Sequence, residues 1–128
     1  MVKKTQRSEQ LTNFLNFIKE AESEYIYFSG LLENENKITQ DLLHKLELDT
    51  TTAKERNKIA TLLANNRKDR RYYKNQVEQL QPIIDIINNQ SCKPFLKQLN
   101  EALGKVRKAE EYHKNRKYFP RILRESGK

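Results

Sequence analysis

Apolar residues recur every three or four positions through the first third of the chain. This alternation places them on one helical face, as in a coiled-coil seam, and predicts a helix over about residues 8–48. The first part of the seam consists of Leu11, Phe14, Ile18, Ala21, Tyr25, Phe28 and Leu32. Ser8 precedes this stripe and is the expected N-cap, because its hydroxyl can accept a hydrogen bond from a first-turn amide.

The seam becomes polar over residues 34–37 and then returns in nearly the same phase with Ile38, Leu42 and Leu46. Two interpretations fit this pattern. Either one helix of about 40 residues runs through, roughly 60 Å long at 1.5 Å per residue, or the helix breaks near Asn34. The retained phase favours a single helix.

A second helix is predicted over about residues 53–88. Thr52 and Glu55 have the spacing of a capping box, so we expect the chain to turn there and run back antiparallel to the first helix. The apolar positions of the second helix are Ile59, Leu63, Tyr73, Val77, Leu80, Ile84 and Ile87. Between Leu63 and Tyr73 the seam positions are occupied by Asn66 and Arg70. A polar pair inside a seam usually sets register or partner choice.

Two prolines shape the rest of the chain. Pro82 lacks an amide hydrogen and is expected to kink the second helix or to begin a short new one. A third helix is predicted over about residues 92–117, with Ser91 as its cap. Pro120 cannot continue that helix, so residues 118–128 are expected to form a basic tail.

Composition narrows the fold class. Of the 128 residues, 36% are hydrophobic and 33% are charged, and there are only three glycines and three prolines. This balance favours long helices with narrow apolar seams, whereas a sandwich or barrel needs a turn every 8–12 residues or so. The expected fold is all-α: a single helical domain over residues 1–128, built as an elongated antiparallel hairpin or coiled coil with a third C-terminal helix.

Residues in the patterns that support catalysis or metal binding are not found. The single cysteine, Cys92, excludes an intramolecular disulfide and a cysteine-based zinc site. His44 and His113 stand on different predicted helices without a partner at metal-ligand spacing, and there is no glycine-rich phosphate loop. We therefore expect no enzyme, metal, cofactor or small-molecule substrate. No apolar run is long enough for a signal peptide or a membrane span, so a cytoplasmic location is expected.

The net charge of +8 is unevenly distributed. Residues 1–48 carry six basic and eight acidic residues, a net charge of −2. Residues 49–90 carry eight basic and five acidic residues, for +3, and residues 91–128 carry eleven and four, for +7. The positive charge thus belongs to the last two-thirds of the chain, which points to an anionic partner there.

Two basic clusters are the candidate binding surfaces. On the second helix, four cations fall within an arc of about 100°, and Tyr72 beside them could stack on a base. The end of the third helix and the tail form the other cluster. The candidate contacts are Arg67, Arg70, Arg71, Tyr72, Lys74, Arg116, Lys117 and Arg121. The plainer alternatives are a solvated helix face with local ion pairs for the first cluster, and a tail folded back as a structural clamp for the second.

The first helix also suggests self-association. Beside the seven seam residues of its first part, the stripe holds four more apolar residues, Leu15, Phe17, Ile26 and Leu31, which makes eleven. One antiparallel helix usually covers fewer, so the first helix should touch more than one neighbour. We expect a homodimer with a seam formed by Leu11, Phe14, Ile18, Tyr25, Phe28 and Leu32.

Residues 69–83 (DRRYYKNQVEQLQPI) and 103–123 (LGKVRKAEEYHKNRKYFPRIL) carry the patterns RR-x-x-K…P and N-R-x-Y-x-P-R-[IV]-L. In these segments the chain resembles a group of small helical accessory proteins encoded by phages of Gram-positive bacteria. The resemblance covers roughly the last 55 residues. It implies a phage accessory protein that acts inside the bacterial host cell.

Two functional hypotheses follow. The first is a non-catalytic binding protein that engages nucleic acid or a host nucleoprotein complex through its basic helix faces. The second is a protein-only inhibitor or adaptor. It would dock on an acidic or nucleic-acid-binding surface of a host replication, transcription or defence protein.

Overall fold

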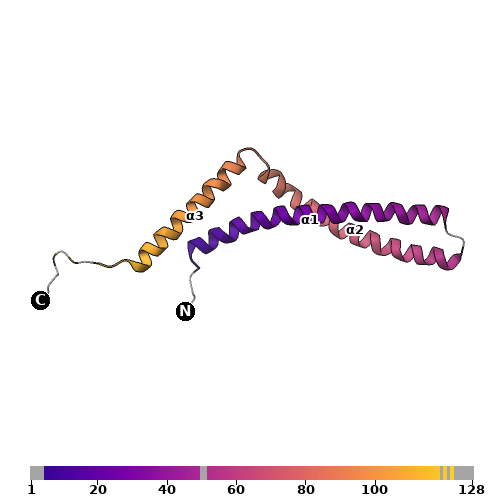
Figure 1. The fold of residues 1–128 in the computed structure, drawn as a ribbon, viewed down its shortest axis with the longest axis horizontal. Helices are drawn as coiled ribbons and strands as arrows, with labels where there is room; N and C mark the ends of the chain where they lie inside the picture. The colour runs from indigo at the N-terminus through magenta and orange to yellow at the C-terminus, as the bar shows by residue number, and fades with distance from the viewer. Residues whose placement is uncertain (1–4, 50–51, 119, 121, 123–128) are drawn as a thin grey trace.

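The computed structural model describes residues 5–49, 52–118, 120 and 122. This part of the chain contains three helices and no strand: α1 (Arg7–Leu48), α2 (Ala53–Ile87) and α3 (Cys92–Asn115). Figure 1 shows α1 and α2 as a long hairpin and α3 as a separate arm that leads back toward the start of α1. The predicted all-α hairpin with a third helix is confirmed. Within the described residues, no helix is both long enough and apolar enough to cross a membrane.

The first helix is continuous. Its 42 residues span about 63 Å at 1.5 Å per residue. The single-helix interpretation is therefore confirmed, and the break near Asn34 is wrong. The reason is that Glu35 and Thr39 continue the seam in phase and find polar partners on α2, so α1 can remain regular through its polar segment.

The hairpin turn follows the sequence prediction. Thr52 is the N-cap of α2, and its hydroxyl oxygen accepts a hydrogen bond from the backbone amide of Glu55 at 3.1 Å. Pro82 lies inside α2, which continues to Ile87 without a new helix beginning. In Figure 1 the last turns of α2 diverge from α1, as expected where a proline interrupts the hydrogen-bond ladder.

The core is a narrow seam between the helices. Tyr25 pairs with Gln81 and Thr39 pairs with Asn66, so α1 and α2 run antiparallel. Among the described residues, the buried apolar ones are Leu15, Ala21, Ile59, Ile84, Ile87 and Leu103, in positions spread over all three helices. Stability therefore depends on many small contacts along a rod.

The third helix is fixed to the first turns of α1. The Ser8 amide donates a hydrogen bond to Glu110 Oε2 at 3.0 Å, and Arg107 Nη2 donates to Thr12 Oγ1 at 3.3 Å. The predicted contact of α1 with more than one neighbour is thus confirmed, because α1 packs against both α2 and α3.

The prediction that Ser8 is the N-cap of α1 is wrong. Gln6 holds that position and makes no side-chain cap bond, and Ser8 lies buried in the first turn. The Glu110 carboxylate caps this turn from α3. First-turn amides lack partners within their own helix, and an anion is favoured at this end of the helix dipole. Hydrogen bonds from the Ser8 hydroxyl and amide lower the pKa of Glu110.

At the start of α3, Ser91 occupies the predicted N-cap position but makes no side-chain cap bond. Its hydroxyl and amide contact Asn89 Oδ1 instead, at 3.0 and 3.1 Å. At the other end, α3 stops at Asn115 and Arg116 is extended, two residues before the predicted end of the helix.

Candidate nucleic-acid interface

Three exposed cations on α2 form what we call the α2 basic cluster: Arg67, Lys68 and Arg71. With Arg70 they line an open hollow of about 370 Å³. Within the described part of the chain, none of the three forms an ion pair with a carboxylate, so their charge remains available to an external anion. Of the three, Lys68 was not among the residues predicted from sequence.

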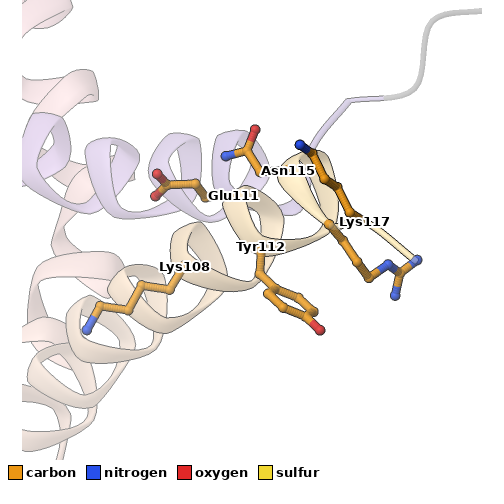
Figure 2. Close-up of a pocket in the computed structure, with 6 residues that line it drawn as sticks. Lys108, Glu111, Tyr112, Asn115 and Lys117 are labelled. Carbon is orange, nitrogen blue, oxygen red and sulfur yellow. The ribbon is translucent and has the colours of Figure 1, made fainter. Parts of the chain in front are cut away.

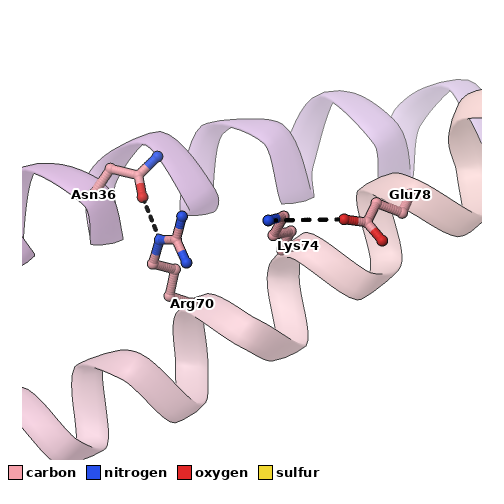
Figure 3. A network of polar contacts seen from close by, with 4 residues as sticks. All are labelled: Asn36, Arg70, Lys74 and Glu78. Carbon is pink, nitrogen blue, oxygen red and sulfur yellow. Dashed lines mark hydrogen bonds and ion pairs between the residues drawn. The ribbon is translucent and has the colours of Figure 1, made fainter.

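Two other predicted contacts on α2 are partly engaged within the protein, as Figure 3 shows. Arg70 is half-buried, and its Nε donates a hydrogen bond of 2.6 Å to Asn36 Oδ1 on α1. Lys74 Nζ lies 4.0 Å from Glu78 Oε1, one turn further along α2. An exposed pair at this distance contributes little stability, so Lys74 can still exchange its partner for a phosphate. Arg70, by contrast, connects α2 to α1 within the hairpin and is less available to a ligand.

The polar layer beside the α2 basic cluster sets the register of the hairpin. Asn66 is only 4% exposed, and its Nδ2 donates to the Glu35 carbonyl at 3.0 Å and to Glu35 Oε2 at 2.6 Å. Thr39 Oγ1 lies 2.5 Å from Asn66 Oδ1 and 2.9 Å from the Glu35 carbonyl, and its single hydrogen can be donated to either oxygen. A shift of the hairpin would place these groups against apolar residues, so the layer favours one alignment.

The aromatic residues next to this layer pack on one another. Tyr72 is 55% exposed, but its ring lies 6.0 Å from that of Phe28 and 5.8 Å from that of Tyr73. Desolvation and, after it, the charges of Asp69 and Glu35 raise the pKa of Tyr73. Tyr72 therefore belongs to an α1–α2 aromatic cluster, although more than half of its surface remains exposed.

The end of α3 carries a second open hollow, of about 530 Å³, shown in Figure 2. It is lined by the predicted residues Arg116 and Lys117 and by Lys108, Glu111, Tyr112 and Asn115. We call this set of residues the α3 basic hollow. Sequence reasoning missed Tyr112 as a site residue, although it stands four residues after Lys108 on one face of α3 and four residues before Arg116, which follows the helix end. The remaining predicted contact, Arg121, lies outside the described residues.

The two basic sites lie at different places along the rod. The α2 basic cluster is next to Asn36 of α1, through Arg70, whereas α3 meets α1 at Thr12. A helix rise of 1.5 Å per residue puts about 36 Å between these two positions on α1. The structure therefore provides two separate cationic surfaces.

The predicted dimer seam is largely used within the chain. Tyr25 OH donates to Gln81 Oε1 at 2.6 Å, and Phe28 contacts Tyr72 and Tyr73. Five of the six predicted seam residues are half-buried, namely Leu11, Ile18, Tyr25, Phe28 and Leu32. Phe14 is 47% exposed. The two helices packed on α1 thus account for much of the wide apolar stripe, and the homodimer stays a prediction.

In the described part of the chain, no group of three His, Cys, Asp or Glu residues is placed to hold a metal ion. Cys92 is a free, half-buried thiol at the start of α3. Comparison with protein-family models, curated proteins and solved structures gives no match. The resemblance to phage accessory proteins therefore stays a prediction from two sequence motifs.

Proposed function

We propose that this chain is a non-catalytic binding protein that engages nucleic acid through the α2 basic cluster and the α3 basic hollow. The observation that carries the proposal is the lack of ion pairs at Arg67, Lys68 and Arg71 within the described residues. Solubility does not require cations to be clustered without acidic partners. Closely spaced cations do favour binding to a phosphate backbone, because they displace the counterions that surround it.

The distance between the two surfaces supports a polymeric ligand. The positions on α1 that contact the neighbours of the two surfaces, Asn36 and Thr12, are about 36 Å apart, which is close to the length of eleven base-pair steps at 3.4 Å each. A short oligonucleotide can occupy one surface only, whereas a longer one can reach both. Because the second contact is then intramolecular, we expect affinity to rise steeply with oligonucleotide length up to the bridging length.

The test is fluorescence anisotropy with random-sequence duplex DNA, single-stranded DNA and RNA between about 50 and 200 mM salt. The variant Arg67→Ala/Lys68→Ala/Arg71→Ala removes three charges from the α2 basic cluster. Its matched control, Lys19→Ala/Lys37→Ala/Lys45→Ala, removes three charges from exposed positions of α1.

For the cluster variant we expect weaker binding and a smaller dependence of log K on log salt, by about 0.9 per lost contact on duplex DNA. The control should bind nearly as well as wild type, since its lysines lie on the acidic helix. Equal loss in both variants would mean that diffuse charge explains the binding. Absence of binding by the wild type at about 50 mM salt would overturn the proposal and favour the protein-only adaptor.

We also propose a cellular setting for this binding, the interior of a bacterial host cell. The two motifs shared with phage accessory proteins support an intracellular role in a bacterial host, with nucleic acid or a host nucleoprotein complex as the partner. Homodimer formation is a separate part, because the basic surfaces do not depend on it. Light scattering that gives the monomer mass of 15.3 kDa across micromolar concentrations would remove the dimer.

A further inference from the structure

The aromatic ring in the α3 basic hollow, that of Tyr112, is placed differently from the ring of Tyr72 beside the α2 basic cluster. Tyr112 is 64% exposed, and in Figure 2 it projects from α3 on the side away from α1. Its ring contact among the described residues is with the neighbouring His113, at 5.8 Å and an interplanar angle of 60°. Tyr72, by contrast, contacts both Phe28 and Tyr73.

The surroundings of Tyr112 combine two kinds of recognition. Lys108, Arg116 and Lys117 line the same hollow and can bind phosphates, while the ring offers an aromatic face. Glu111 also lines the hollow, but Figure 2 shows it together with Asn115 on the α1 side of α3, opposite Tyr112. The carboxylate and the ring therefore leave α3 in different directions, about 100° apart around the helix.

An exposed aromatic ring between cations distinguishes single strands from duplexes. In a duplex, the faces of the bases are stacked on one another, and only the phosphate backbone and the groove edges are accessible. In a single strand, every base has a face that can stack on an aromatic side chain, while cations beside the ring hold the flanking phosphates.

We infer that the α3 basic hollow binds single-stranded nucleic acid, with Tyr112 as the platform on which one base stacks. This inference rests on the proposed function and deepens it, because it names the form of nucleic acid that the protein selects. Stacking is independent of base identity, so the site should show little sequence preference.

The test uses the full chain and three variants in anisotropy titrations. The probes are a 20-nucleotide oligo-dT, a 20-nucleotide oligo-U and a duplex of the same length. Tyr112→Leu keeps an apolar side chain but removes the ring, and Tyr112→Phe keeps the ring. Tyr27→Leu is the matched control, since Tyr27 is 63% exposed on the acidic helix α1.

For Tyr112→Leu we expect about tenfold weaker binding to a single strand, with the salt dependence and the duplex affinity unchanged. Tyr112→Phe and Tyr27→Leu should bind like wild type. A single-stranded probe with 2-aminopurine should be quenched by wild type and not by Tyr112→Leu. Comparison of oligo-dT with oligo-U identifies DNA or RNA as the preferred strand.

The possible failures are distinguishable. If wild type binds single strands and duplexes equally and Tyr112→Leu changes neither, the stacking inference is overturned while the proposed function stands. If wild type binds none of the three probes, the proposed function fails with it. Circular dichroism of Tyr112→Leu at 222 nm shows whether α3 is intact, and a fully helical variant that loses single-strand affinity supports the inference.

Discussion

Removing the buried side-chain amide of Asn66 should destabilise the hairpin, whereas the same substitution at its exposed neighbour Asn65 should not. Asn66 is 4% exposed and makes three hydrogen bonds to Glu35 and Thr39 across the seam. The preceding residue, Asn65, is exposed on the same helix. Asn65→Ala is therefore a control that makes the same change in helix propensity.

The expected magnitude follows from what each partner retains. In Asn66→Ala, Thr39 can still donate to the Glu35 carbonyl at 2.9 Å, and the half-buried Glu35 carboxylate can reach water. Because Thr39 and the Glu35 carbonyl can pair with each other, the loss is mainly that of the bond to the Glu35 carboxylate, about 2 kcal/mol. Replacing Asn by Ala in a helix returns about 0.5 kcal/mol. The net destabilisation should be about 1.5 kcal/mol.

Thermal unfolding followed by circular dichroism at 222 nm measures this difference. At about 4 °C per kcal/mol for a chain of this size, Asn66→Ala should lower the Tm by about 6 °C, whereas Asn65→Ala should raise it by about 2 °C. If the two variants unfold at the same temperature, Asn66 contributes nothing beyond propensity, and the polar layer does not hold the hairpin as argued.

Three further changes test other contacts. Glu110→Gln should flatten the dependence of Tm on pH below about 4.5, because the lowered pKa of Glu110 makes its stabilisation complete above that value and lost as pH falls through the folded-state pKa. The exposed Glu111→Gln serves as its control, and equal pH profiles for both would contradict the role of Glu110 as a cap. Thr52→Ala should cost about 1 kcal/mol in chemical denaturation, whereas Thr52→Ser should be nearly neutral; a harmless Thr52→Ala would argue against the cap. Tyr25→Phe removes the hydroxyl that bonds Gln81 and should cost about 1 kcal/mol, and an unchanged denaturation midpoint would mean that water replaces that bond.

The candidate site was predictable in part. The charge pattern indicates Arg67, Arg71, Arg116 and Lys117, because a cluster of cations is visible in the sequence whatever its surroundings. The sequence did not show which residues of the clusters are engaged within the protein and which are exposed to a ligand. Arg70 and Tyr72 contact α1, whereas Tyr112, which shares a helix face with Lys108, lines the α3 basic hollow.

The helices, the turn at Thr52 and the antiparallel hairpin could be predicted from local sequence patterns alone. These features depend on local periodicity and capping, and both involve residues a few positions apart. The sequence also marked Asn66 as a polar interruption of the seam, but could not name Glu35 and Thr39 as its partners.

The contacts between segments far apart in the chain could not be predicted from local patterns. Glu110 caps α1 from more than one hundred positions away, and the sequence pointed to the local Ser8 instead. The retained phase already favoured a continuous α1 through Asn34, but the partners on α2 that pair with its polar segment were not visible in the sequence. In each case an unpaired polar group near a helix end or in a seam needs a partner, and chain folding, not local sequence, determines which partner lies within hydrogen-bond distance.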